Sequence, residues 1–189
     1  MSRRAELVDH TRQRITEAAM RLHTTVGPSQ ASIAAIAEEA GVTRLTVYRH
    51  FRDQEELFSA CMGHWATLHP APDPAAWVAI PDLETRARQA LNELYAWYGE
   101  VGDELHPIHR DITAVPLGAR EAMRAGPLAM AEVIVGKDAP SGARGRRLRG
   151  VAGHLVSLGT WRSLVVEQGL TTQEAVGLGV DWLLAVAER

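Results

Sequence analysis

The stretch "AGVTRLTVYRHF", residues 40–51, decides the fold because it gathers cationic side chains directly after a glycine. It contains Arg44 and Arg49, Arg52 follows at once, and no acidic residue occurs in it before Asp53. The chain as a whole is acidic, with 20 Lys and Arg against 23 Asp and Glu and a net charge of −3. A cationic segment in an acidic chain indicates a local binding surface for an anion.

Length and composition limit the class of protein. Of the 189 residues, 46% are hydrophobic and 23% are charged, which is an ordinary balance for a soluble globular protein. No apolar run approaches the roughly 18 residues that cross a bilayer, and the N-terminus lacks the apolar core of a signal peptide. The single cysteine, Cys61, excludes an internal disulfide and a multi-cysteine zinc site. We therefore expect a cytoplasmic protein with no cofactor and no membrane partner.

The whole chain has the pattern of an all-α protein. Strand-like alternation is missing, and Gly and Pro fall at intervals that end helices. Ser32 is a plausible N-cap, and Asp53–Glu56 and Thr171–Glu174 have the spacing of a capping box. We expect helices near residues 11–27, 31–40, 43–49 and from 53 onward, a proline-rich connection over 69–82, a helix over 82–101, shorter pieces broken at Pro107, Pro116 and Pro127, and closing helices over 143–168 and 172–188.

Two short helices joined by a tight turn with a glycine form a helix-turn-helix, whose second helix lies in the DNA major groove. Gly41 can adopt the left-handed conformation that reverses the chain without a Cβ clash. Four apolar side chains then point inward and fix the pair to the first helix: Ile36, Val42, Val47 and Phe51.

The outward side chains of this segment suit a DNA groove. Arg44 can bond a guanine edge bidentately, a contact worth roughly 1–3 kcal/mol against the wrong base, and Leu45 can pack on a thymine methyl group. Other polar side chains can donate to phosphates, which fix the register: Ser32, Thr43, Thr46, Tyr48, Arg49 and His50. The alternative is a solvated cationic face, and the order of capped helix, turn glycine and short cationic helix favours DNA.

In this region the sequence resembles the tetracycline-repressor (TetR) family of bacterial transcription regulators. The resemblance rests on "RITEAAMRLHTTVG" (14–27) and on "ASIAAIAEEAGVTRLTVYRHFRDQEELF" (31–58), with the turn glycine, the Thr-x-Tyr pair and Phe51 in place. It implies that seven side chains touch DNA: Ser32, Thr43, Arg44, Leu45, Thr46, Tyr48 and His50.

Gln54 departs from the family pattern, which commonly has Lys or Arg at the start of the fourth helix. An amide can hydrogen-bond a phosphate, but it releases no counterion. We expect Gln54 to contact a phosphate through its amide. DNA affinity is then expected to depend more on Arg49, Arg52 and the Arg3–Arg4 arm.

The resemblance implies a three-helix DNA-binding domain at 1–55 and a regulatory domain for ligand binding and dimerisation at 56–189. The closing helices are apolar on two sides, which indicates burial against their own domain and against a second copy. We expect the dimer interface at Leu155, Leu158, Val176, Val180 and Leu183. The alternative is a helix wholly inside a monomer core. A twofold dimer predicts a palindromic operator.

Several aromatic and polar side chains in the second domain are candidates for an effector pocket. They are Trp65, Tyr95, Tyr98, Met123, His154 and Trp161, although residues of this kind are more often plain core. The low charge of this region favours an apolar or aromatic small molecule.

The sequence therefore predicts a dimeric DNA-binding regulator, a repressor that a small-molecule effector releases from its operator. The alternatives are DNA binding without a ligand switch and a TetR-like activator. An enzyme is not supported, because the chain has no phosphate-binding glycine loop and no credible Ser/His/Asp grouping. His106, His109 and Asp111 could form a metal site, but a surface or N-cap role is the favoured interpretation.

Overall fold

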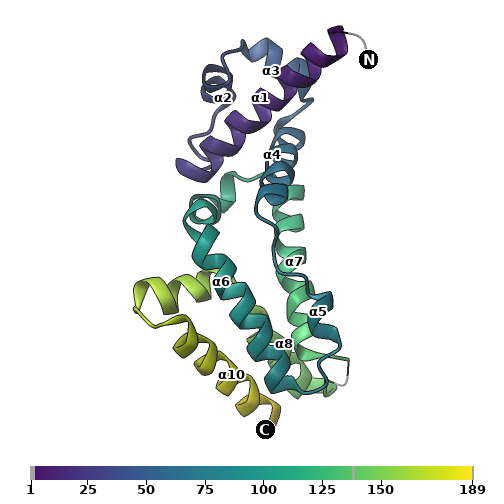
Figure 1. Cartoon of the computed structure of the whole chain (residues 1–189), viewed down its shortest axis with the longest axis vertical. Coiled ribbons are helices and arrows are strands. Elements are labelled where there is room, and N and C mark those ends of the chain that lie inside the picture. The colour runs from purple at the N-terminus through teal and green to yellow at the C-terminus, as the bar shows by residue number, and fades with distance from the viewer. Residues whose placement is uncertain (1–2, 138, 189) are drawn as a thin grey trace. The chain divides into compact units, whose positions relative to one another are not determined.

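The computed structural model in Figure 1 describes residues 3–137 and 139–188. Within these ranges the chain is helical and contains no strand, so the all-α class predicted from the sequence is confirmed. The elements are α1 (Arg3–Thr25), α2 (Ile33–Glu39), α3 (Arg44–His50), α4 (Gln54–Leu68), α5 (Ala75–Val78), α6 (Leu83–Arg110), α7 (Leu117–Val135), α8 (Gly142–Leu155), α9 (Leu158–Trp161) and α10 (Thr172–Glu188), with short helices η1 (Ile112–Ala114) and η2 (Arg162–Glu167). None of these helices has the length and apolar character needed to span a membrane.

The described residues form two compact units. The first contains the residues up to Pro70 together with Asp103–Ala122, and the second contains Ala71–Gly102 together with the residues from Met123 onward. Each unit is therefore built from segments that are distant in sequence, and α6 and α7 contribute residues to both. The division of function at residue 55 stays a prediction.

The core of the first unit forms where α1 packs on α4 and on α2, and α2 packs on α3. Ile36, Val47 and Phe51 are buried in it, as the sequence predicts, while Val42 is only half-buried at its edge. The helix-turn-helix is thus anchored through one face of each short helix, and the opposite faces are left to solvent.

Proline does not end helices here as the sequence suggests. Pro107 and Pro127 lie inside α6 and α7. The turn after Pro107 stays helical because Asp111 N donates to its carbonyl at 3.1 Å and Ile108 is fully buried, which offsets the one helical hydrogen bond that proline removes. Of the three prolines expected to break helices, only Pro116, between η1 and α7, separates two elements.

The proline-rich connection contains one turn of helix that the sequence did not indicate. In α5, Trp77 is fully buried, and its indole Nε1 donates to Glu93 Oε2 at 2.8 Å. Burial of one large aromatic ring outweighs the flanking prolines.

The helix expected to run unbroken to residue 168 is interrupted after α8. Leu155 ends α8, Ser157 caps α9 with its hydroxyl, and a π-helical turn follows. The carbonyls beside this break accept hydrogen bonds from outside the helix. Tyr95 donates to Leu155 O at 2.9 Å, and Tyr98 donates to Val156 O at 2.8 Å. Two buried hydroxyls thereby stabilise the interruption.

Candidate nucleic-acid interface

The turn between α2 and α3 is defined by caps on both helices. Ser32 Oγ accepts from Ala35 N at 3.2 Å and starts α2. Gly41 follows α2 with φ +63°, in the left-handed region that favours glycine. Thr43 then starts α3 by accepting from Thr46 N at 3.2 Å. The Ser32 cap and the role of Gly41 are as predicted.

Substitution of Gly41 should loosen this turn. We expect Gly41→Ala to lower the free energy of unfolding by about 1–2 kcal/mol, because a side chain in the left-handed region is strained. Its Cβ would also lie 3.0 Å from Arg14 Nη2. Urea unfolding measures the change. Gly63→Ala is the matched control, because Gly63 is helical with open space around it, and there alanine should stabilise by about 1 kcal/mol. Equal effects of the two variants would contradict this account of the turn.

The outer side of α3 carries an unusual set of exposed residues, which we call the exposed α3 face: Thr43, Arg44, Leu45, Tyr48 and Arg49. Leu45 is 60% exposed and Tyr48 is 56% exposed, although both are large and largely apolar. The two remaining predicted DNA contacts on α3, Thr46 and His50, are half-buried. An exposed leucine and tyrosine beside two arginines form a surface suited to contact with an anionic, partly apolar partner.

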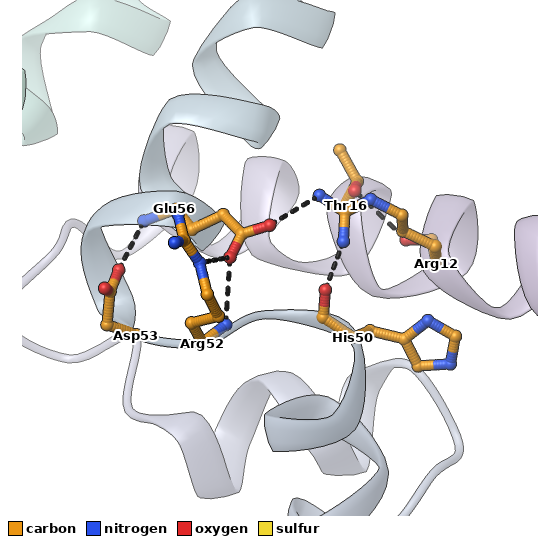
Figure 2. A network of polar contacts seen from close by, with 6 residues as sticks. All are labelled: Arg12, Thr16, His50, Arg52, Asp53 and Glu56. Carbon is orange, nitrogen blue, oxygen red and sulfur yellow. Dashed lines mark hydrogen bonds and ion pairs between the residues drawn. The ribbon is translucent and has the colours of Figure 1, made fainter.

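The end of α3 is fixed to α1 and α4 by Arg12, as Figure 2 shows. One guanidinium nitrogen donates to His50 O, and another donates to Glu56 Oε1 at 3.1 Å. The guanidinium also lies over the Phe51 ring, 4.1 Å from its centroid. The Arg12 side chain of α1 therefore links the end of α3 to the start of α4. Sequence reasoning missed Arg12, because only the tertiary fold brings α1 beside residues 50–56.

Glu56 collects the hydrogen bonds at the start of α4. Arg52 donates to its Oε2 from the backbone N at 3.0 Å and from Nε at 3.1 Å. These bonds, with that from Arg12, lower the pKa of Glu56 to about 2. The capping box is incomplete: Glu56 N donates to Asp53 Oδ1 at 2.8 Å, but the Glu56 carboxylate accepts from Arg52 N instead of Asp53 N. Arg52, expected to strengthen DNA binding, is already paired within the chain.

Two further predicted contacts lie at helix starts of the first unit. Ser32 is exposed at the start of α2, and Gln54 is exposed as the first residue of α4. Their side chains and the first backbone N–H groups of these helices can donate to phosphates. The side chains of Arg3 and Arg4 lie outside the described residues.

A clamp that the sequence did not indicate holds the loop between α1 and α2. Asp111 Oδ2 accepts from Ser29 N at 3.2 Å and from the Ser29 hydroxyl, and Arg110 Nη2 donates to Val26 O at 2.8 Å. Gly27, with φ +95°, leaves no room for a Cβ beside these two side chains. Asp111 thus has a structural role, and no metal-binding cluster occurs among the residues that the structure describes.

Comparison with known proteins points to the same region. The model of the family described as "Bacterial regulatory proteins, tetR family" matches residues 15–61, which include α2, α3 and the core of the helix-turn-helix. Residues 15–61 therefore match the DNA-binding region of the TetR family. The resemblance noted from the sequence is thereby confirmed.

Three TetR-type relatives match over part of the chain. The HTH-type transcriptional regulator AcrR of Shigella flexneri is 49% identical over 49 residues, 26% of this chain and 23% of AcrR. SrpR of Pseudomonas putida is 37% identical over 78 residues, 38% of this chain and 37% of SrpR. TtgR, also of Pseudomonas putida, is 39% identical over 74 residues, 39% of this chain and 34% of TtgR. The chain therefore covers less than two-fifths of the length of each of these relatives.

Two solved structures resemble nearly the whole chain. The transcriptional regulator FadR from Bacillus subtilis, in complex with stearoyl-CoA, has a TM-score of 0.61 at 16% identity and covers 90% of this chain and 96% of its own. A TetR-like regulator from Rhodococcus sp. RHA1 has a TM-score of 0.53 at 16% identity, covering 92% and 93%. At these identities the likeness shows the fold alone, which is that of a TetR-like regulator.

The side chains predicted to line an effector pocket are distributed through both units. Trp65 is buried in the first unit, where its Nε1 donates to Glu104 at 2.6 Å. Tyr95, Tyr98 and Trp161 are buried in the second unit, and the hydroxyls of both tyrosines bond backbone carbonyls there. The other two differ in exposure, because Met123 is half-buried and His154 is exposed.

The side chains predicted to form the dimer interface are buried within their own chain. Leu155, Leu158, Val176, Val180 and Leu183 are all at most 4% exposed. Leu155 of α8 and Val176, Val180 and Leu183 of α10 are buried where these two helices pack together, and Leu158 is buried on α9. The outer side of α10 exposes the second apolar stripe instead, with Leu178 53% and Trp182 46% exposed. The residues of the dimer interface stay a prediction.

Proposed function

We propose that this chain is a TetR-family, DNA-binding transcriptional regulator that binds a palindromic operator as a homodimer in the cytoplasm. In the simplest arrangement it is a repressor, whose bound dimer blocks a promoter. The observation that carries the proposal is the exposed α3 face on a helix-turn-helix whose other side is packed against α1. The relatives named above are transcriptional regulators, and we propose no catalytic activity.

The chemistry of the exposed α3 face matches the edges of base pairs in the major groove. Arg44 presents a guanidinium for the O6 and N7 acceptors of guanine, and Leu45 presents an apolar surface for a thymine methyl group. Tyr48 and Arg49 can donate to the flanking phosphates, and Ser32 and Gln54 can do so from the starts of α2 and α4. Base contacts and phosphate contacts are thus supplied by different side chains.

Rigid placement of α3 supports this assignment. Arg12 holds the end of α3 through the His50 carbonyl and the Phe51 ring, and it also bonds Glu56 at the start of α4. A reading helix that is ordered before it meets DNA loses less conformational freedom on binding, so more of the contact energy appears as affinity.

Selection of bound fragments from a random DNA pool tests the proposal. At moderate salt we expect enrichment of one palindromic sequence, whose half-site centres are separated by about one helical turn or a multiple of it. The affinity for this DNA should fall as the salt concentration rises, because phosphate contacts release counterions. Recovery of unrelated fragments with no shared motif would contradict the proposal.

The dimer is proposed to form through the exposed stripe on α10. Trp182 is a large aromatic side chain that is half-exposed, and its ring meets His154 of α8 in an edge arrangement with centroids 5.7 Å apart. Exposed apolar stripes that include tryptophan are typical of protein interfaces. Pairing α8 and α10 with those of a second copy would remove Leu178 and Trp182 from water.

Truncation of Trp182 should weaken the dimer. We expect Trp182→Ala to raise the dissociation constant of the dimer at least about tenfold, because buried tryptophans are frequent hot spots. Sedimentation measured over a range of concentrations gives the constant. Leu128→Ala is the control, since Leu128 is an exposed apolar residue on α7 outside the stripe. A monomeric wild-type protein, or equal constants for the two variants, would argue against this interface.

We propose further that a small-molecule effector binds the second unit and lowers DNA affinity. A cavity of about 620 Å³ in that unit has apolar walls, including Leu83, Val133 and Leu148, and Arg86 and Arg149 also border it. Its volume lies within the range of about 300–1,000 Å³ that is usual for ligand pockets. The lining favours a largely apolar effector. A protein whose operator affinity no ligand changes would instead be a DNA-binding protein without a switch.

A further inference from the structure

A second cavity, of about 290 Å³ and partly open to solvent, is lined by residues of the first unit alone. Its walls come from the end of α1, the loop that leads to α2, α2 itself, the start of α4 and the segment around Ala114. None of the described side chains that line it is an acid, a lysine or an arginine. It is separate from the proposed effector cavity, and it borders two of the proposed DNA contacts, Ser32 and Gln54.

In this cavity, one of the two ring nitrogens of His23 has a hydrogen-bond partner among the described residues, and the other has none. His23 lines the cavity and is only 6% exposed. Its Nδ1 lies 3.2 Å from Cys61 Sγ, whose thiol donates to Phe58 O at 3.1 Å. Because the thiol proton is used, we assign the ring proton to Nδ1, which donates to sulfur. Nε2 is then an acceptor, and no described residue hydrogen-bonds to it.

The lining is mixed: one side of the cavity carries an aromatic ring and aliphatic side chains, and its polar side chains include Ser29, Ser32 and Gln54. The Phe58 ring lies 4.9 Å from the His23 ring at an angle of 47°, and Ile36 and Leu57 complete the apolar floor. Burial keeps the His23 ring neutral, because it lowers the pKa of His23 to about 4. A charged ligand would lose its hydration here without gaining an opposite charge, so the occupant should be uncharged.

We propose that this cavity binds a small uncharged aromatic molecule that carries one N–H or O–H group, with that group donating to His23 Nε2. The volume is near the lower end for ligand pockets, which sets the size at one or two rings, as in phenol or indole. The acceptor selects molecules with a donor over analogues without one, because an analogue without a donor displaces water from Nε2 and does not replace its hydrogen bond.

Occupancy of this site should also affect DNA binding. Ser32 and Gln54, both proposed phosphate contacts, line the same cavity. Ser29 lines it too, and Ser29 is held by the Asp111 carboxylate in the loop clamp. A ligand that engages the Ser32 hydroxyl or the Gln54 amide competes with a phosphate for the same donor. By thermodynamic linkage, operator DNA would then lower the affinity for the ligand by the same factor by which the ligand lowers the affinity for DNA.

Calorimetric titration of the full-length chain without DNA tests the site itself. Indole and N-methylindole are the probes, because they differ at the one donor that the proposal requires. We expect indole to bind, and N-methylindole to bind at least about tenfold more weakly, since it cannot satisfy Nε2. His23→Phe should weaken the binding of indole by a similar factor. His10→Phe, at an exposed histidine of α1, is the control and should leave binding unchanged.

A second variant keeps the test decisive if His23→Phe fails to fold. Ala114 is exposed at the edge of the cavity, so Ala114→Phe should narrow the cavity and abolish indole binding without changing the core. The proposal is overturned if indole does not bind the wild type. It is equally overturned if indole binds the wild type and Ala114→Phe alike, or binds no better than N-methylindole.

Discussion

Arg44→Ala is expected to weaken operator binding by between about 30-fold and about 10⁴-fold. A bidentate contact between arginine and guanine is worth roughly 1–3 kcal/mol, and a twofold dimer loses two of them, roughly 2–6 kcal/mol in total. Arg44 is exposed and makes no ion pair with a described residue, so its removal should leave the fold intact. Fluorescence anisotropy with the selected duplex measures the loss.

Arg49→Ala provides the contrast that distinguishes base reading from charge. Arg49 is equally exposed on α3 and is assigned to a phosphate. Loss of Arg49 should weaken binding to all DNA sequences to a similar extent and reduce the salt dependence of binding. Arg44→Ala should instead relax the base preference at one base pair in each half-site. If Arg44→Ala weakened operator and unrelated DNA by the same factor, Arg44 would be a phosphate contact and not a base contact.

The second large effect concerns stability in mild acid. His23 in the folded chain has a pKa of about 4, lowered from 6.5 by burial. Between these values the unfolded chain takes up a proton and the folded chain does not, so stability is complete above pH 6.5 and falls as pH decreases. The slope is at most about 1.4 kcal/mol per pH unit, which sums to roughly 3 kcal/mol by pH 4.

Urea unfolding at several pH values between 4 and 6.5 measures this slope. Glu56 contributes in the same direction at the acid end of this range, because its pKa is lowered from 4.5 to about 2 and the unfolded chain begins to protonate it below about pH 5.5. The difference in slope between the wild type and His23→Phe therefore reports His23. His23→Phe should flatten the curve, while His10→Phe should leave the slope as in the wild type. A wild-type slope that survives in His23→Phe would place the acid sensitivity at another group.

The DNA-binding end of the chain was predictable from sequence because its signals are local. The Ser32 cap, the turn at Gly41 and the burial of Val47 and Phe51 all follow from residue type and spacing, and the structure has each of them. The exposure of Leu45 also follows from the period of α3. Local propensity and tertiary packing agree in this segment, which is why the family pattern is recognisable there.

The second unit was less predictable because packing between distant segments decides it. Helical spacing predicts two apolar stripes on α10 but does not show which one faces α8, and the structure buries the stripe that holds Val176, Val180 and Leu183. Tyr95 and Tyr98 look like pocket residues in the sequence, yet their hydroxyls bond the carbonyls beside the break after α8. That break, like the helical turn through Pro107, depends on contacts made far along the chain.

The most direct test of the central claim is the ratio of two affinities. The dissociation constant of the wild-type protein is measured for the selected palindrome and for a scrambled duplex of the same length and composition, at one salt concentration. A protein that reads bases through the exposed α3 face should bind the palindrome about 10³-fold or more tightly. Equal constants for the two duplexes would show that the cationic segment around Arg44 attracts phosphates without reading sequence, and the proposed regulatory function would fail.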